Sequence, residues 1–180
     1  WDVSKVTIFD KTFGSQHQNA GDMKLKKLDL SNWNPVSAQK MVGMFYGCGH
    51  LTELDLSDWN MPNLTNAGHL FADCYQLETV DMSGWNTPAL ISVDAMFNHC
   101  TTLKTVDLSD LDTTNVKEFS QMFEACNSLE NIIGMENWDT SKGCTFVEMF
   151  NGCGALKELD LSGFNTGAAY DRYLDTNNSY

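Results

Sequence analysis

The sequence contains little positive charge. Of its 180 residues, 11 are lysine or arginine and 24 are aspartate or glutamate, which gives a formal net charge of −13 at pH 7. Arg172 is the single arginine, and no lysine or arginine occurs between Met41 and Leu103. Proteins that bind nucleic acid or an anionic membrane need clustered basic side chains. We therefore expect neither partner, and a surface whose negative field attracts cations.

Long apolar segments are also missing. No uninterrupted apolar run exceeds four residues, whereas a membrane-spanning helix needs about 20. Hydrophobic residues still make up 42% of the chain and charged residues only 19%, which is not the composition of a disordered protein. We expect a folded domain with a sizeable core and no segment inserted in a membrane.

The chain is built from a repeat of about 26 residues. The common unit, which most repeats follow with a few substitutions, reads Leu-x-x-Leu-Asp-Leu-Ser-x-Trp, continues through a polar turn, and ends in Met-Phe-x-x-Cys. Regular self-similarity of this kind indicates a solenoid of stacked coils. The anchors, which recur at a nearly constant interval after a longer first spacing, are Trp1, Trp33, Trp59, Trp85, Leu111, Trp138 and Phe164.

Each unit predicts one strand and one helix. The segment 54–56 alternates apolar and polar residues, as a strand with one buried face does. After the anchors at 33, 59, 85 and 111, apolar residues return at offsets of 5, 8, 12 and 15, which places them on one face of a helix. We therefore predict an α/β, leucine-rich-repeat-like solenoid of about six coils, each with one short parallel strand and one helix. The strands are expected near residues 25–30, 51–56, 77–82, 103–108, 129–134 and 156–161.

Departures from the repeat suggest the domain boundaries. A single repeat domain is expected over residues 1–165. Six extra residues precede Leu25 and predict a loop insertion near residues 15–24. Residues 166–180 are polar and are expected to form a C-terminal tail or cap. In the strand near 129–134, Ile133 and Gly134 interrupt the aspartate pattern.

Stacking would align the aspartates of successive repeats in a column on the outer face of the sheet. These aspartates are Asp29, Asp55, Asp81, Asp107 and Asp160. The serine two residues after each could neutralise it by a hydrogen bond; a row of calcium sites and an acidic face that binds a partner are the alternatives. The candidate binding residues are the outward positions Glu53, Asp55, Glu78, Asp81 and Asp107.

Five of the six cysteines form a second column. They are Cys48, Cys74, Cys100, Cys126 and Cys153, whereas Cys144 lies outside it. Side chains at one phase of a stack are parallel, and a disulfide needs them to face each other, so we expect free buried thiols. The Met-Phe pairs are predicted to be core. The tryptophans are expected to seal the bend after each strand, with an exposed aromatic stripe as the alternative.

The repeat resembles that of the BspA-like surface proteins, also called the mycoplasma lipoprotein repeat family. That family reads Leu-x-x-Leu-Asp-Leu-Ser-x-Trp-Asp-Thr-Ser-x-Val-x-x-Met-x-x-Met-Phe-x-x-Cys, and residues 103–126 follow it nearly throughout. The resemblance extends over about residues 1–165. It implies an extracellular or cell-surface protein used for adhesion or protein contact, and it supplies no catalytic residues.

Two functions follow as expectations. The first is a non-catalytic binding or adhesion scaffold that contacts a protein or glycan through its acidic sheet face. The alternative is a structural subunit of an extracellular fibre, appendage or coat that self-associates through the ends of the solenoid, because neither end carries an evident cap. No nucleophile elbow, phosphate loop, zinc motif or dinucleotide fingerprint occurs. We expect no enzyme activity, no cofactor and no metal.

Overall fold

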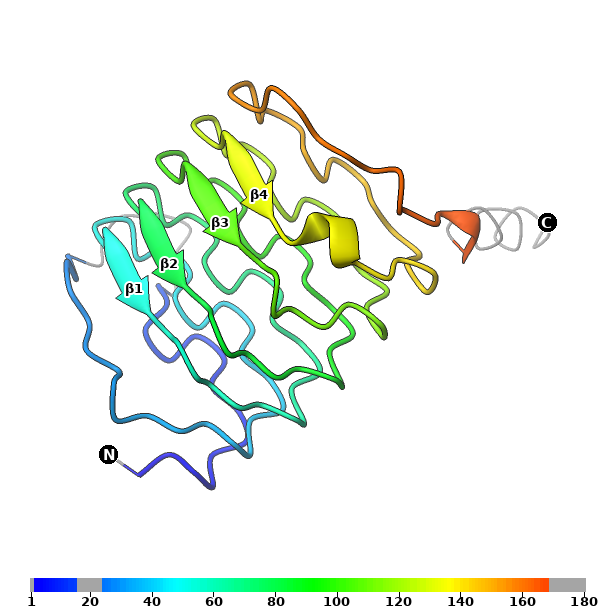
Figure 1. Ribbon diagram of the computed structural model, residues 1–180. Helices are drawn as coiled ribbons and strands as arrows, with labels where there is room; N and C mark the ends of the chain where they lie inside the picture. Colours follow the sequence, from blue (N-terminus) through cyan, green and yellow to red (C-terminus); the bar gives the residue numbers. More distant parts are fainter. Residues whose placement is uncertain (1, 16–23, 169–180) are drawn as a thin grey trace, which may run out of the picture.

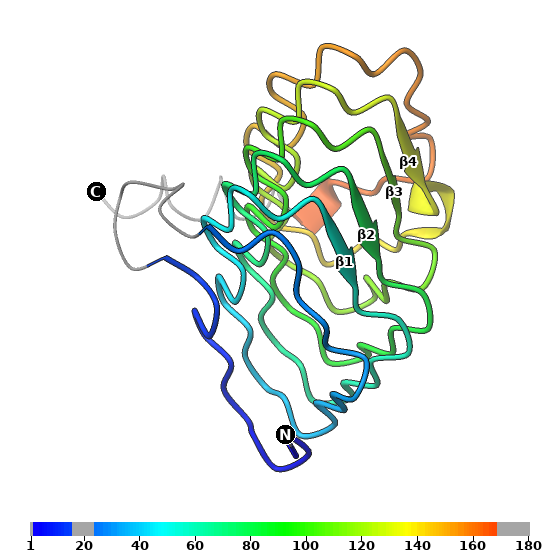
Figure 2. The same ribbon diagram turned by 90° about the vertical axis from the view of Figure 1, so that its left-hand side faces the viewer.

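The computed structural model describes residues 2–15 and 24–168, in which the chain winds through coils of one repeat each that stack one on the next (Figure 1, Figure 2). One side of the stack carries a short strand in each of four consecutive coils. A 3-10 helix, η1 (Met135–Asn137), follows the last of them. The strands are β1 (Glu53–Asp55), β2 (Thr79–Asp81), β3 (Thr105–Asp107) and β4 (Asn131–Ile133).

These strands form two parallel pairs. β1 pairs with β2, and β3 pairs with β4, with equivalent positions of successive repeats facing each other, such as Leu54 opposite Val80. In β1, β2 and β3 only the middle side chain points to the core. Among the described residues, the expected strands at 25–30 and 156–161 do not form. Instead of the predicted sheet of six strands, the described residues form four strands in two separate pairs.

The prediction of one helix per coil, and with it the α/β leucine-rich-repeat-like solenoid, is wrong. In the described ranges, the helical residues are confined to η1 and to 167–168 at their edge. The segment predicted to be helical in the third repeat consists of consecutive tight turns. The Ala72 N–H donates to the His69 carbonyl at 3.1 Å, and the Cys74 N–H to the Phe71 carbonyl at 3.1 Å. Both bonds reach back three residues, whereas those of an α-helix reach back four.

Other amides of these turns bond to the next coil. The N–H groups of Ala67, His69 and Phe71 donate to carbonyls of the coil that follows, at 2.7–3.0 Å. An α-helix would direct the same groups to its own carbonyls. Parallel bridges run through six successive coils on this side, at Ile8, Lys40, Asn66, Ser92, Glu118 and Thr145. The continuous backbone ladder thus lies where the sequence predicted helices.

A left-handed residue recurs every four residues in these turn segments. His69 and Asp73 have φ of 55° and 61°, and Gly43 and Gly47 hold the same positions one coil earlier. Each left-handed residue redirects the chain, so that apolar residues four apart face inward again. This spacing coincides with that of one helix face. Apolar periodicity alone therefore could not separate a helix from a series of four-residue turns.

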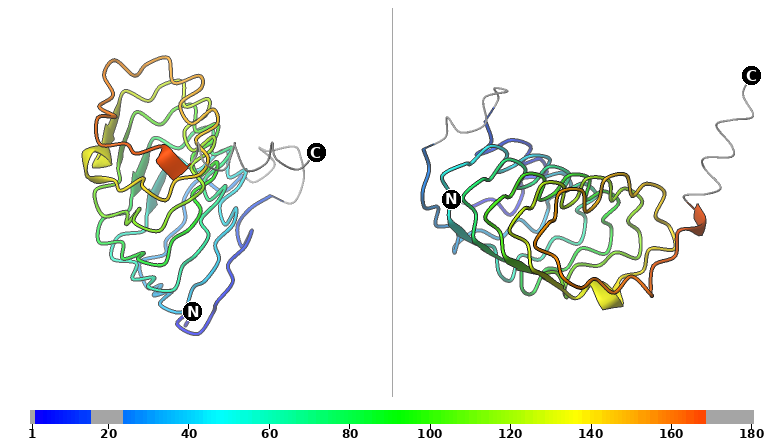
Figure 3. Two further views of the ribbon diagram at one scale, coloured as in Figure 1. Left: turned by 90° about the vertical axis from the view of Figure 1, so that its right-hand side faces the viewer. Right: turned by 90° about the horizontal axis from the view of Figure 1, so that it is seen from above.

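The coils lie one behind another (Figure 3). The buried side chains between their two sides form stacked columns. Neighbouring rings of the main aromatic column have centroids 5.1–5.7 Å apart. Trp59, Trp85 and Trp138 are only 3–5% exposed, so the expected burial of the tryptophans is confirmed for these three and they form no exposed stripe. The main column consists of Phe13, Phe45, Phe71, Phe97, Phe123 and Phe150.

The predicted column of free buried thiols is confirmed except at Cys153, which is free but only half-buried. All six cysteines are free, and Cys48, Cys74, Cys100 and Cys126 are buried. Each thiol of the column donates to the carbonyl of a phenylalanine in the preceding coil, at 3.0–3.3 Å. Burial raises the pKa of Cys48 to about 11 and that of Cys126 to about 12.

Thiol labelling at pH 8 is expected to modify Cys144 rapidly and the buried thiols only after unfolding. With a pKa of about 11, Cys48 is thiolate in only about 0.1% of molecules at that pH. Mass spectrometry of the labelled chain counts the modified thiols. Burial raises these pKa values above the ordinary 9.0, because the folded protein favours the neutral thiols. The contribution of these thiols to the stability of the folded state is therefore complete below pH 9 and is lost as the pH rises through 11 to 12. Labelling of Cys100 as fast as Cys144 would contradict the packing.

Two predicted boundaries lie largely outside the described residues. The insertion near 15–24 is described only at Ser15 and Lys24, and the tail at 166–180 only to residue 168. Within the described part, no helix has the length and apolar character needed to cross a bilayer.

Candidate functional site

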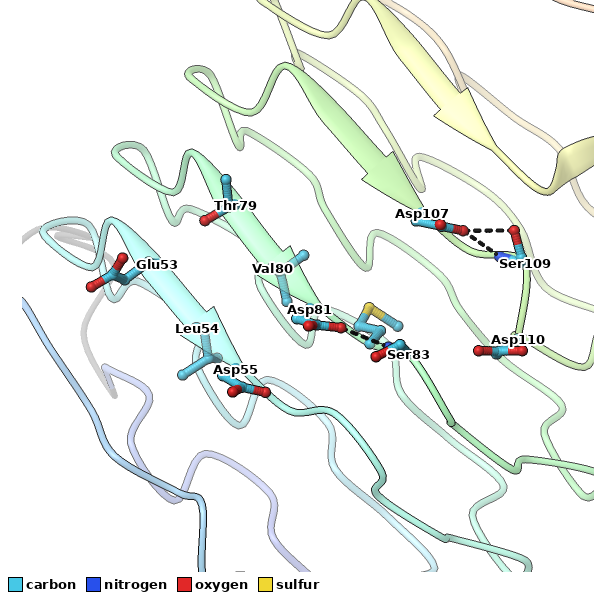
Figure 4. Close-up of a pocket in the computed structure, with 11 residues that line it drawn as sticks. Glu53, Leu54, Asp55, Thr79, Val80, Asp81, Ser83, Asp107, Ser109 and Asp110 are labelled. Atoms are coloured by element: carbon cyan, nitrogen blue, oxygen red, sulfur yellow. Dashed lines mark hydrogen bonds between the residues drawn. The ribbon is translucent and has the colours of Figure 1, made fainter.

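A groove of about 500 Å³ lies on the outer face of β1, β2 and β3 (Figure 4). It arises because each three-residue strand buries its middle side chain and exposes the two that flank it. The serine turns that follow β2 and β3 close one end. The lining residues are Glu53, Leu54, Asp55, Thr79, Val80, Asp81, Met82, Ser83, Asp107, Ser109 and Asp110.

The groove is strongly anionic. Five of its lining residues are carboxylates, and none is lysine or arginine. The one described ion pair at its border joins the Lys27 Nζ to the Glu53 Oε1 at 3.1 Å, and both side chains are well exposed. Exposed pairs of this kind are weak and screened by salt. A field of one sign therefore covers the groove.

Serine turns hold the aspartates in place. The Asp55 Oδ1 accepts the Ser57 N–H at 3.0 Å and the Ser57 hydroxyl at 2.7 Å. Asp107 accepts the same two bonds from Ser109, at 3.0 and 2.6 Å. Asp81 accepts the Ser83 N–H at 2.9 Å.

These hydrogen bonds stabilise the ionised aspartates. The serine hydroxyl bond, followed by the amide bond, lowers the pKa of Asp55 and of Asp107 below the ordinary 3.8. Both carboxylates therefore stay charged well below neutral pH. The serine interpretation of the column is confirmed at these positions, and one oxygen of each carboxylate is still free to accept a ligand.

The calcium interpretation has no support in the geometry. In residues 2–15 and 24–168, no group of three or more histidine, cysteine, aspartate or glutamate side chains converges closely enough to hold a metal ion. The column aspartates Asp55, Asp81 and Asp107 lie one per coil, side by side, rather than around a common centre (Figure 4).

The structure brings most of the predicted site residues together. Glu53, Asp55, Asp81 and Asp107 line the groove, whereas Glu78 is exposed just before β2 and does not. Asp29 and Asp160, the outer members of the column, also lie outside the lining. Ile133 pairs with Asp107 in the register and ends the acidic row.

Sequence reasoning missed Asp110. Its Oδ2 accepts the Gly84 N–H of the preceding coil at 2.8 Å, which ties the groove wall together across two coils. Gly84 has φ of 76°, and a Cβ there would lie 2.8 Å from the Asp58 Oδ1. The sequence contained a signal for this contact. The position just before the anchor is held in three successive repeats by Asp58, Gly84 and Asp110.

Comparison with known proteins assigns the chain to one family. No curated protein and no solved structure matches it. One family matches twice, over residues 1–106 and 91–173, and the two overlapping matches cover nearly the whole chain. The chain therefore belongs to the family described as "Mycoplasma protein of unknown function, DUF285".

Proposed function

We propose that this chain is a non-catalytic binding and adhesion module that holds a protein partner by a basic segment laid in the acidic groove. The observation that carries the proposal is the groove itself, which five carboxylates line without a basic residue. A cleft of one charge concentrates ligands of the opposite charge and speeds their association.

The groove is suited to a lysine- or arginine-bearing peptide. The serine turns fix the Asp55 and Asp107 carboxylates before any partner arrives, so little side-chain freedom is lost on binding. Val80 and Met82, 9% and 4% exposed, form an apolar floor for the methylene stem of a lysine. A glycan is the alternative partner, because free carboxylate oxygens accept bonds from sugar hydroxyls. The net charge favours the basic protein.

The resemblance to BspA-like surface repeats supports an extracellular or cell-surface location. That resemblance is finer than the family match, which identifies mycoplasma repeat proteins without a function. In that location, the acidic face would contact a neighbouring protein.

The test is binding to a lysine-rich peptide in low salt. The variant Asp55→Asn/Asp81→Asn/Asp107→Asn is expected to bind roughly tenfold more weakly, since each lost exposed pair contributes about 0.2–1 kcal/mol. Calorimetry at about 20 mM and about 200 mM salt measures the affinity, and the difference between the two proteins should shrink at the higher salt.

A matched control exists in the same chain. Asp2, Asp112 and Asp139 lie outside the groove lining, and each accepts the N–H of the residue two positions on, at 2.8–3.0 Å. Their triple replacement by asparagine makes the same change in net charge, at three turns closed by the same backbone N–H bond. Equal losses in the two triple variants would mean that overall charge, and not the groove, binds the peptide.

A further inference from the structure

The five carboxylates of the acidic groove gather on its two outer coils. Strand β1 contributes Glu53 and Asp55, which we call the first acidic pair. The coil of β3 contributes Asp107 and Asp110, which we call the second acidic pair. Between the two pairs, the coil of β2 contributes only Asp81 (Figure 4).

The middle coil has neutral residues where its neighbours have acidic ones. Thr79 lies opposite Glu53 in the strand register, and Gly84 holds the repeat position that Asp110 has one coil later. The floor between them is apolar, since Val80 is only 9% exposed. A ligand that runs along the stack therefore meets two carboxylates, then one carboxylate over an apolar floor, then two carboxylates again.

A lysine of this chain already lies against the first acidic pair. The Lys27 Nζ lies 3.1 Å from the Glu53 Oε1. A second hollow, of about 280 Å³, shares Glu53 and Asp55 with the groove and has Lys27 in its lining. An ammonium group on a flexible stem is therefore a ligand that this part of the groove accepts within the structure itself.

The distance between the two acidic pairs sets the spacing of a ligand's charges. Neighbouring parallel strands lie about 4.8 Å apart, so Asp55 and Asp107, at equivalent positions two coils apart, are separated by about 9.6 Å. A polyproline II segment advances about 9.3 Å in three residues and brings the next side chain back to the same face. An extended strand places side chains on one face about 6.8 Å apart, which matches neither one coil nor two.

The backbone of the groove floor also favours a ligand whose own backbone stays in water. Strands β1 and β2 are paired with each other, so the face of the sheet offers no ladder to an added strand. A polyproline II segment needs no ladder, because its backbone is fully solvated.

We propose that the groove selects segments in which two lysines stand three residues apart in a polyproline II conformation, as in Lys-Pro-Pro-Lys. One ammonium group binds the first acidic pair and the other binds the second, while uncharged residues cross the middle coil. Two linked contacts give an affinity that neither contact gives alone. This inference rests on the proposed function and adds to it the spacing and conformation of the partner's basic residues.

Three peptides of equal length, composition and charge test the spacing. They carry Lys-Pro-Pro-Lys, Lys-Pro-Lys-Pro or Lys-Lys-Pro-Pro between the same proline-rich flanks. Because polyproline II turns successive side chains by about 120°, only the first peptide presents both lysines to the groove. Calorimetry in about 20 mM salt is expected to give about threefold to fivefold tighter binding for Lys-Pro-Pro-Lys than for the other two.

The test variant is Asp107→Asn/Asp110→Asn, which removes the charge of the second acidic pair. An asparagine at 110 keeps an oxygen for the Gly84 N–H, which Asp110 accepts at 2.8 Å. This variant should bind the three peptides equally. Its matched control, Asp112→Asn/Asp139→Asn, makes the same change in net charge outside the groove lining and should keep the preference for Lys-Pro-Pro-Lys. Circular dichroism of both variants verifies that the coils are folded.

Lys27→Ala is a second test, because it frees the first acidic pair from the lysine of the chain itself. The variant should bind Lys-Pro-Pro-Lys about twofold more tightly than the wild type. Its matched control is Lys26→Ala, since Lys26 is exposed and lines neither the groove nor the second hollow. The control should change the affinity less.

The outcomes separate this inference from the proposed function. Equal affinities of the wild type for the three peptides, or a preference that persists in Asp107→Asn/Asp110→Asn, overturn the spacing and leave the groove as a binding site for basic segments. Weaker binding of Lys-Pro-Pro-Lys by Lys27→Ala overturns the first acidic pair as one of the two contacts. Failure of all three peptides to bind overturns both the spacing and the proposed function.

Discussion

Replacing Gly134 by alanine is expected to lower the free energy of unfolding by about 3 kcal/mol or more. The residue has φ of 91°, and a Cβ on it would lie 2.5 Å from both the Cα and the N of Ser109. These are backbone atoms of the neighbouring coil, so no side-chain rotation can relieve the clash. The two coils would have to separate beside the paired strands β3 and β4. The left-handed backbone adds about 1–2 kcal/mol of strain for any residue with a Cβ.

Gly154→Ala is the matched control for this substitution. A Cβ at Gly154 would meet no atom within 4 Å, so its effect should stay within about 0.5 kcal/mol. Chemical denaturation of the two variants and the wild type, followed by tryptophan fluorescence, measures the difference. Equal stabilities for the two alanine variants would show that the coils are not packed as closely at Gly134 as the structure indicates.

Phe97→Ala is expected to cost about 3–5 kcal/mol. Phe97 is fully buried and stacks on Phe71 at 5.1 Å and on Phe123 at 5.7 Å. Truncation leaves a cavity in the middle of the column and removes both stacking contacts, each of which contributes about 0.5–1.5 kcal/mol beyond burial. The structure cannot close the gap easily, because the backbone ladder fixes the spacing of the coils.

The end of the same column provides the comparison. Phe150 is only partly buried and stacks on one described ring, that of Phe123. Phe150→Ala should therefore cost about half as much as Phe97→Ala, measured by chemical denaturation of both variants. Phe97→Leu keeps most of the volume and should fall between the two. If Phe150→Ala proved the more damaging variant, the column would not be the continuous core described above.

Much of the interior could be predicted from sequence because stacking turns equal repeat positions into columns. The buried Phe71, Trp85 and Cys100 each have counterparts at the same position of neighbouring repeats, and their burial follows from that regularity. The helices could not be excluded in this way. Apolar offsets of three and four residues suit both a helix face and a run of four-residue turns, and the left-handed residues that decide between them include His69 and Ala95, which give no glycine signal.

Part of the acidic site could also be predicted from a regular sequence pattern. Alternation along a strand identifies Asp55 and Asp81 as outward residues. It does not reveal where a strand begins, and because β2 begins at Thr79, Glu78 falls outside the groove. Asp110 enters the lining through a bond to the backbone of Gly84 in the preceding coil. Contacts between coils at a turn depend on geometry that no single repeat contains.

The one-way ladder of the turn segments gives the stack an electrical polarity. The carbonyl of Gly68 accepts the Gly43 N–H at 2.9 Å, and the next amide, that of His69, donates to Asp94 at 2.7 Å. The peptide unit between them is bonded on both sides in the same direction. Aligned peptide dipoles add along an axis, as they do in a helix, whereas those of ordinary sheets largely cancel. The described coils therefore form a dipole that is positive toward the coil of Glu148 and negative toward the coil of Lys11, so each of these two side chains carries the charge that the field at its own coil favours.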